Sequence, residues 1–549
     1  MSILKWFRTK QKGNQPAGGR QTSSAPTPSP ERNSTATVNG NMEDTLQFIN
    51  KALGENDDFL IRRFHVFGRF QAVMMYFSNM INQNTVNTDI LKPLMQPPVY
   101  LEPKSIETHQ LKEILLNDVM YHSEGKLESH LDKLVDGLVR GETVVVVQGL
   151  DEALLIGTRN IDKRSIDQPA TEMVIRGPRE GFIELLGTNI ALIRYRLQSP
   201  DFRMHTMEIG KRTKSKVAVC FMDGITNPEL VQEVKKRLSK IDTSSVLDSG
   251  VLEQYIEDNH LSPFPQVQYT ERPDKVVANM LEGRVVIMVD GSPMALMVPT
   301  VFSQLYQTVE DYNERFLLMS SIRMARLVAL VFSLIFPSLY VAVISFNPEL
   351  IPTEFAVAVA GGRSGVPFPA IIEVLIMEIS MEVLREATIR LPQQVGGALS
   401  IVGVLVIGQA AVSAGFSSPI TVVIIALTTI GSFATPAYNA ALALRLLRFP
   451  LIIMAGLFGL YGIMIGLILI ANHLLSLKSF GVPYLSPLVP GNFKGMKDLL
   501  FRSPLWWFKS RPEMLKTIDD TRTAPNIMDE LKNTSENVLD PLNQRKKER

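Results

Sequence analysis

Long uncharged apolar segments dominate the second half of the chain. Residues 327–348 and 391–444 contain no charged side chain, and residues 449–477 are apolar except for His473 near their end. A helix of about 20 apolar residues is long enough to cross the hydrocarbon core of a bilayer. A soluble core does not require three such runs, so we predict an all-α, multi-pass membrane domain over residues 327–477.

Glycine and proline divide the longest of these runs. Breaks fall at Gly396-Gly397, at Ser417-Ser418-Pro419 and at Pro436. Because these residues interrupt helices, we expect two spans here, over about residues 397–416 and 419–435.

An acidic helix is predicted between the first two apolar runs. Glu378, Glu382 and Glu386 follow Glu373 and recur at four-residue steps, so these three share one helical face. One interpretation is an amphipathic helix that lies flat at the membrane surface. The other is a helix that packs against partners or lines a water-filled vestibule, where its carboxylates would concentrate cations.

The charge distribution leaves two topologies open. Arg315, Arg323 and Arg326 precede the first run, which places the soluble half in the cytoplasm by the positive-inside rule. If the acidic helix spans the membrane, there are five spans, and the C-terminal tail lies outside. If it lies flat, there are four spans and the tail lies inside, as its excess of Lys and Arg favours. The flat arrangement places Arg445 and Arg448 outside, whereas the spanning one places them inside with Arg385 and Arg390.

A pore-lining face is predicted on the 397–416 helix. Three- and four-residue steps place five residues on this face: Ala398, Val402, Leu405, Gln409 and Val412. An amide in lipid needs a hydrogen-bond partner. Gln409 either lines a wet passage, with Leu405 as an apolar constriction, or bonds across a helix interface.

The soluble half precedes the membrane domain. We predict a helical subdomain over residues 43–140, because Leu60, Phe64 and Phe67 recur at helical steps. Further helical stretches are expected near residues 105–116 and 126–138.

A change of pattern near residue 141 predicts an α/β subdomain over residues 141–315. Residues 143–147 and 153–156 form one expected hairpin, and residues 284–289 and 293–298 form another around Asp290-Gly291-Ser292. A strand is expected at 216–221, where Cys220 is interpreted as a buried thiol. A helix capped by Asn227 is expected at 228–240. The fold class is therefore an α/β cytoplasmic N-terminal domain joined to the membrane domain.

Both ends of the chain are polar. Residues 1–42 are predicted to be a disordered basic tail, because Ser, Thr, Pro, Gly and Asn predominate there. Residues 478–549 are predicted to be a polar C-terminal tail. The net charge of +1 gives no global field for nucleic acid, so none is expected as a partner.

Catalytic signatures are missing from the sequence. It contains no glycine-rich phosphate loop, GxSxG, HExxH or CxxC motif, and its seven histidines are scattered. We therefore expect neither an enzyme nor a metal or other cofactor.

Several stretches carry a resemblance to a known family. They are Arg176–Phe182 (RGPREGF), Thr188–Leu197 (TNIALIRYRL), Asp248–Asp274, Gly283–Pro299, Pro367–Pro392, Ile401–Ala411, Leu444–Gly462 and Ser479–Tyr484. Over residues 43–490 the chain resembles the A subunits of GerA-type spore germination receptors.

The resemblance implies a receptor subunit in the inner membrane of the dormant spore. It implies a homo-oligomeric ring of A subunits, with a transporter-like B subunit and a lipoprotein C subunit. Nutrient binding would then open a cation path. The residue patterns alone indicate only a cytoplasmic α/β module on a helical membrane domain. A secondary transporter of a small nutrient is the alternative, although no second copy of the 391–444 pattern supports it.

Overall fold

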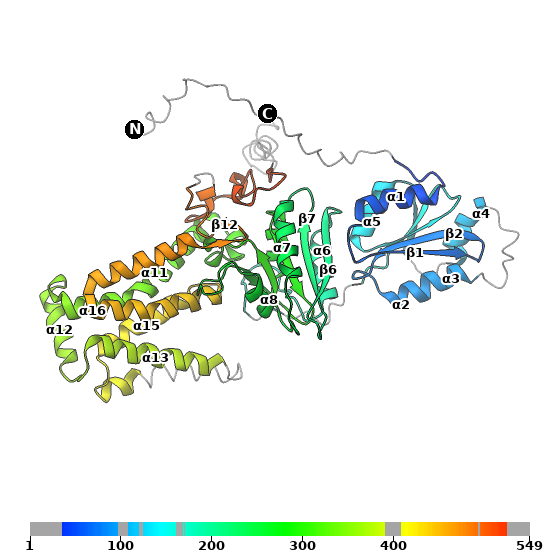
Figure 1. Ribbon diagram of the computed structural model, residues 1–549. Coiled ribbons are helices and arrows are strands. Elements are labelled where there is room, and N and C mark those ends of the chain that lie inside the picture. The colour runs from blue at the N-terminus through cyan, green and yellow to red at the C-terminus, as the bar shows by residue number, and fades with distance from the viewer. Residues whose placement is uncertain are drawn as a thin grey trace, which may run out of the picture.

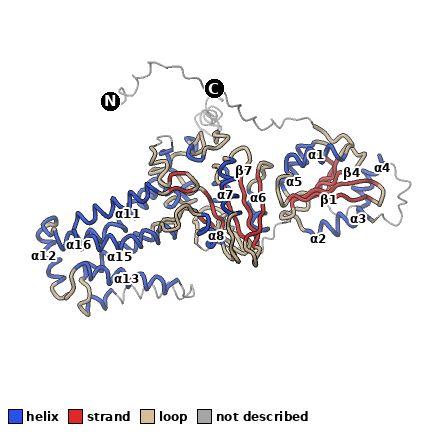
Figure 2. Tube along the Cα trace, viewed as in Figure 1, coloured by secondary structure: helices blue, strands red, loops and turns tan. Residues whose placement is uncertain are grey.

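The computed structural model describes residues 36–96, 108–119, 124–160, 168–169, 171–389, 408–491 and 495–523. These residues form two α/β domains, a bundle of helices and a C-terminal segment. Figure 1 shows the second α/β domain between the first domain and the bundle. Figure 2 shows the two main sheets within the α/β domains and the helical character of the bundle.

The first α/β domain is a five-stranded antiparallel sheet with helices on both faces. Its strands are β1 (Phe59–Val66), β2 (Phe70–Phe77), β3 (Gly125–Glu128), β4 (Thr143–Val147) and β5 (Ala153–Ile156), in the order β1-β2-β4-β5-β3. One face packs on α1 (Met42–Leu53) and α5 (Leu131–Arg140), and the other on α3 (Lys92–Met95) and α4 (Thr108–Glu113). The short α2 (Gln83–Thr85) and π-helical turns at Val86–Leu91 and Ile114–Val119 complete it.

The helix predicted through Leu60, Phe64 and Phe67 is wrong. The structure places these residues on β1 and in the turn after it, and β1 pairs with β2 in antiparallel register. Phe67 and Gly68 form the turn with positive φ angles of 52° and 69°. The apolar spacing fits a helix, but pairing with β2 decides the conformation. A helical subdomain over residues 43–140 is wrong too, since β1, β2 and β3 lie within it, and β4 and β5 beyond residue 140 complete the same sheet.

The second α/β domain repeats this architecture. Its strands are β6 (Phe202–Ile209), β7 (Ser215–Met222), β8 (Gln268–Thr270), β9 (Val285–Val289) and β10 (Ala295–Val298), in the order β6-β7-β9-β10-β8. One face packs on α6 (Leu186–Arg196) and α9 (Pro273–Leu281), and the other on α7 (Pro228–Ser239) and α8 (Ser249–Ile256). Both predicted hairpins are confirmed as β4–β5 and β9–β10. Cys220 lies buried on β7, as predicted, and burial raises the pKa of its thiol to about 12.

The two domains are a structural duplication. Their sheets have the same strand order, and their last helix and hairpin align without a gap. Gly283 follows Gly141 by 142 residues, and Gly291 follows Gly149 by the same interval. Gly149 and Gly291 occupy equivalent hairpin turns with φ angles of 91° and 90°. Glycines with the same positive φ at equivalent positions indicate that one folding unit is present twice.

A buried ion pair joins the two domains. Arg194 on α6 contacts Asp58 at 2.6 Å, and both side chains are 2% exposed. Asn56 accepts a hydrogen bond from Arg194 at 3.2 Å and another from the backbone N–H of Met204 at 2.9 Å. These contacts couple the segment before β1 to the second domain.

The helical bundle begins at the second domain. Its elements are α10 (Glu310–Asn313), α11 (Phe316–Phe346), α12 (Thr353–Arg363), α13 (Ala370–Ile389), α15 (Pro419–Phe433) and α16 (Tyr438–Ser476). Among the described residues, α11 and α16 are long and apolar enough to cross a membrane. α15 is shorter, at 15 residues.

α16 reverses direction at Gly459. Its φ and ψ angles of 60° and −141° are not helical. A β-carbon at Gly466 would lie 2.5 Å from Cδ1 of Leu451, so these residues pack together. In one straight helix, 15 residues would separate them by about 22 Å. The single span predicted over residues 449–477 is therefore two antiparallel helical segments.

The bundle helices run between a near end, at the second α/β domain, and a far end at α12 (Figure 1). α11 runs from the near end to Phe346, which packs on Gly459. α15 runs the opposite way, since Thr421 near its start donates to the Tyr340 hydroxyl and Gly431 lies against Ala329.

α13 also runs toward the near end. Ile371 at its start packs on Gly456 beside the reversal of α16, whereas Glu382 reaches Arg445. Both ends of α16 contact the second α/β domain. Tyr269 donates to Asn439 at 3.4 Å, and Ser262 Oγ lies 2.9 Å from Nε2 of His473.

The described part of the C-terminal tail packs on the second α/β domain. It contains β11 (Lys478–Ser479), β12 (Val482–Pro483) and short 3-10 turns at Gly495–Asp498, Leu505–Trp507 and Glu513–Leu515. The Tyr484 hydroxyl donates to the Pro265 carbonyl at 2.7 Å. At the other end of the chain, Val38 is buried and donates its N–H to Ser129. Disorder predicted through residue 42 is therefore wrong from Val38 onward.

Candidate functional site

The carboxylates of α13 face arginines of α16. Glu378 contacts Arg448 at 2.9 Å, and these side chains are 6% and 2% exposed. One turn further along, Glu382 lies 3.5 Å from Arg445 and also pairs with Arg385 of its own helix. Opposite charges thus neutralise most of the predicted acidic ridge. We call these five residues the charged ladder.

Glu373 holds the far end of α13 in place. Its carboxylate accepts hydrogen bonds from the Ser417 hydroxyl at 3.2 Å and from the backbone N–H of Ser418. Arg363 at the end of α12 lies 3.4 Å away. Ser418 in turn caps α15 by accepting from the Thr421 N–H. Glu373 therefore ties together the ends of three helices.

The two flanks of α13 have different surroundings. Met377 and Met381 are buried in the bundle core with Leu384 packed against it, whereas Ile379 and Val383 on the opposite flank are 53% and 64% exposed. This geometry agrees with the interpretation of a helix packed against partners. The water-filled vestibule stays a prediction. Glu386 is exposed at the near end.

The proposed pore face is only partly within the described residues. Ala398, Val402 and Leu405 lie outside them. Residues 408–413 are helical, with Gln409 exposed and Val412 half-buried. Gly408 packs on Val422 of α15. The pore-lining role of this face stays a prediction.

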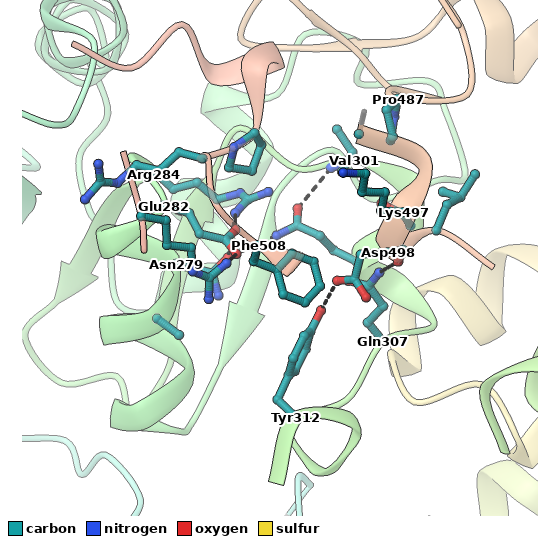
Figure 3. A pocket seen from close by; sticks show the side chains of 18 of the residues that line it. Asn279, Glu282, Arg284, Val301, Gln307, Tyr312, Pro487, Lys497, Asp498 and Phe508 are labelled. Carbon is teal, nitrogen blue, oxygen red and sulfur yellow. Dashed lines mark hydrogen bonds and ion pairs between the residues drawn. The ribbon is translucent and has the colours of Figure 1, made fainter. Parts of the chain in front are cut away.

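A cavity of about 860 Å³ separates the second α/β domain from the C-terminal tail. Figure 3 shows Asn279, Glu282 and Arg284 on one side, Tyr312 and Asp498 on the other, and Phe508 between them. Arg284 donates to Asn279 at 3.1 Å and pairs with Glu282, and the Tyr312 hydroxyl donates to Asp498. The contact between Tyr312 and Asp498, together with Arg522 of the tail at 3.5 Å from Glu282, holds the tail in place.

The family of the chain follows from comparison with known proteins. Residues 47–514 match the model described as Bacillus/Clostridium GerA spore germination protein. The chain belongs to the GerA family. The match includes both α/β domains, the bundle and the tail as far as residue 514, beyond the limit near residue 490 inferred from the sequence. The predicted resemblance to GerA-type A subunits is confirmed.

GerA relatives match most of the chain. Spore germination protein KA of Bacillus subtilis (strain 168) is 42% identical and covers 90% of each chain. The uncharacterized membrane protein YfkQ of the same organism is 40% identical over 88% of this chain and 93% of its own. A crystal structure of the N-terminal domain of the A subunit of the Bacillus megaterium spore germinant receptor GerK3 is 29% identical. It covers 49% of this chain and 98% of its own, with a TM-score of 0.39.

Sequence reasoning missed one buried network of this GerA chain, at the start of α11. Arg323 contacts Asp311 at 3.0 Å and Asp498 at 2.8 Å, and Arg326 contacts Asp311 at 3.1 Å. Burial raises the pKa of Asp498, and burial together with the Asp498 charge raises that of Tyr312. The sequence identified both arginines as charges flanking a span. It carried no signal for Asp498, which is 175 residues from Arg323.

Proposed function

We propose that this chain is the A-type subunit of a nutrient germinant receptor that conducts cations across the inner membrane of the spore. Membership of the GerA family supports the receptor role. The distribution of charge in the bundle supports membrane insertion and conduction.

An apolar outside and a charged inside support membrane insertion. Large apolar side chains are exposed on the bundle surface, among them Val328, Ile430, Leu457 and Ile468. The charged ladder is mostly buried between α13 and α16. A hydrocarbon environment favours this arrangement, because charges inside a membrane must be paired or hydrated. The membrane-protein relative and the two long apolar helices support membrane association as well.

Six crossings account for the helix directions. The described crossing segments are α11, α13, α15 and the two halves of α16. Ile389 ends α13 at the near end and Pro419 begins α15 at the far end, so we propose that the 397–416 span predicted from the sequence is the sixth. This number reconciles the two charge arguments, because Arg445, Arg448 and the tail all lie toward the α/β domains. We place those domains in the cytoplasm by the positive-inside rule.

An exposed amide supports a multi-subunit pore. Gln409 is exposed on a bundle whose surface is otherwise largely apolar. An amide in contact with lipid is costly, so it needs either water or another subunit. We propose a homo-oligomeric ring in which Gln409 faces a wet passage. A transporter-like B subunit and a lipoprotein C subunit complete the proposed receptor.

Ion flux through purified full-length protein in liposomes tests conduction. We expect Leu405→Ala to leak K⁺, because it widens the proposed apolar constriction. Leu457→Ala, on the exposed surface of α16, is the matched control and should not leak. Both variants must retain the oligomeric state of the wild type in size-exclusion chromatography. Unchanged permeability of assembled Leu405→Ala would contradict the pore, and saturable uptake of a nutrient would instead indicate a transporter.

A further inference from the structure

A tryptophan-rich segment of the C-terminal tail lies at the near end of the bundle (Figure 1). Residues 499–508 have the sequence LLFRSPLWWF and contain two of the three tryptophans of the chain. We call these residues the aromatic segment. Five of its large apolar side chains are exposed: Leu500, Phe501, Leu505, Trp506 and Trp507. A group of exposed apolar side chains of this size indicates an interaction surface.

The aromatic segment packs on the first turns of α11. The rings of Trp506 and Phe316 lie 6.1 Å apart, and the Arg502 carbonyl accepts a hydrogen bond from the Ser320 hydroxyl at 3.0 Å. The side chain of Arg502 points into the protein, since this residue is 4% exposed and its guanidinium lies 5.8 Å from the centre of the Tyr312 ring. The segment therefore turns its charged side chain inward and leaves its apolar side chains outside.

The outer side of α11 continues this apolar surface. From Leu317 to Val331 every exposed residue of α11 is uncharged, whereas Arg323 and Arg326 contact Asp311 in the buried network. With 31 residues, α11 is about 46 Å long, and the hydrocarbon core is about 30 Å thick. When its middle lies at the bilayer centre, α11 extends about 8 Å beyond this core at each end. The first turns of α11 then lie among lipid headgroups, together with the aromatic segment beside them.

We propose that the aromatic segment is an interfacial membrane anchor. It inserts exposed aromatic side chains among the headgroups of the leaflet on the side of the α/β domains. This inference rests on the proposed insertion of the bundle into a membrane. Tryptophan suits this position, because its ring is apolar and its N–H can reach a polar partner. The exposed Lys497 and Lys509 flank the segment and favour anionic headgroups. Anchoring holds the tail, and its Asp498 contact with Arg323, at the membrane surface.

Fluorescence quenching by spin-labelled lipids tests the anchor. The full-length protein is reconstituted in nanodiscs of phosphatidylcholine and phosphatidylglycerol, and single introduced cysteines carry a bimane label. Phe501→Cys reports on the aromatic segment, and Leu60→Cys on β1, exposed in the first α/β domain, is the matched control. Val331→Cys, exposed at the middle of α11, reports on insertion of the bundle itself. Cys220 is fully buried and gives little background.

The depth of the quencher distinguishes the outcomes. A nitroxide on the lipid headgroup should quench the label of Phe501→Cys at least about twofold more than that of Leu60→Cys, because aromatic anchors lie at headgroup depth. A nitroxide in the middle of the acyl chain should quench the label of Val331→Cys most. Quenching of Val331→Cys without quenching of Phe501→Cys would overturn the anchor and leave bundle insertion intact.

The other occupants of this surface also give distinct results. Quenching of Phe501→Cys by aqueous iodide alone would place the aromatic segment in water. Protection from both iodide and lipid nitroxides would place it against a neighbouring subunit, and either result would overturn the anchor. Loss of lipid quenching at Val331→Cys would contradict insertion of the bundle, and the anchor with it.

Discussion

The ion pair between Glu378 and Arg448 lies buried inside the bundle. Both residues are almost fully buried, and Arg448 directs Nη1 at both carboxylate oxygens, at 2.9 and 3.0 Å. Removing one partner of such a pair leaves a buried, uncompensated charge, which costs far more than the pair itself contributes.

We expect Glu378→Gln to destabilise the protein by about 3–5 kcal/mol, because Arg448 loses its counter-charge. The double variant Glu378→Gln/Arg448→Met should recover part of this loss. Glu354→Gln, at an exposed position on α12, is the matched control. Denaturant unfolding in detergent micelles measures the free energy of unfolding of each variant. A single variant as stable as the control would show that the pair does not hold the bundle together.

The raised pKa of Glu253 on α8 predicts that the stability of the protein depends on pH. Burial, with help from Glu257 and Asp248, raises its pKa from 4.5 to about 8. Between pH 4.5 and 8, Glu253 is therefore protonated in the folded state but ionised in the unfolded state. The free energy of unfolding falls as pH rises through this range.

Glu253→Gln removes that penalty. The variant should match the wild type near pH 4.5 and exceed it by about 2–4 kcal/mol above pH 8. Glu208→Gln on β6, which is exposed, should show no such divergence. Thermal unfolding across this pH range measures both. A constant difference between Glu253→Gln and wild type at every pH would refute the assignment.

At the scale of single residues, the sequence predicts the carboxylates of the charged ladder but not their arginine partners. Helical periodicity is local, so the shared face of Glu378, Glu382 and Glu386 could be recognised. Their partners Arg445 and Arg448 lie on another helix, and only tertiary packing brings them close. Arg445 and Arg448 were recognised only as charges that close an apolar run.

Among the elements, α16 differs most from the structure that its sequence pattern predicts. Its apolar sequence continues through Gly459, yet the chain reverses there. The φ and ψ values of this residue are accessible essentially only to glycine. A β-carbon would also lie 3.1 Å from the ring of Phe346.

Gly459→Ala should therefore lower the stability of the bundle by at least about 2 kcal/mol. Gly361→Ala in α12 is the matched control, because its β-carbon would meet open space and alanine favours a helix. Thermal unfolding of both variants in the same detergent provides the comparison. Equal melting temperatures would mean that the reversal tolerates a side chain.

Elements with strong local signals could be predicted. The turn around Asp290-Gly291 and the β-branched run at 143–147 led directly to hairpins that the structure contains. β1 could not be recognised from its apolar spacing, because its pairing with β2 outweighs the helical pattern. Local signals likewise gave no indication that α16 turns back, since glycine is also tolerated inside membrane helices.

At the scale of the whole molecule, the sequence indicated the duplicated α/β domains and the helical bundle in different ways. The two α/β domains have the same strand order. The sequence predicted the hairpin of each domain separately, but it did not show that the two hairpins belong to a repeat. In the proposed topology, the two charge arguments that conflicted in the sequence agree. The reversal at Gly459 would add one crossing, and the tail packs beside the α/β domains.

Single-cysteine labelling in sealed membrane vesicles of one orientation tests the central claim most directly. Val357→Cys is exposed at the far end on α12, and Lys509→Cys is exposed in the tail, while Cys220 is buried. A membrane-impermeant maleimide should label only one of the two before permeabilisation and both afterwards. Labelling of both sites from the same side of an intact membrane would contradict a bundle that crosses it.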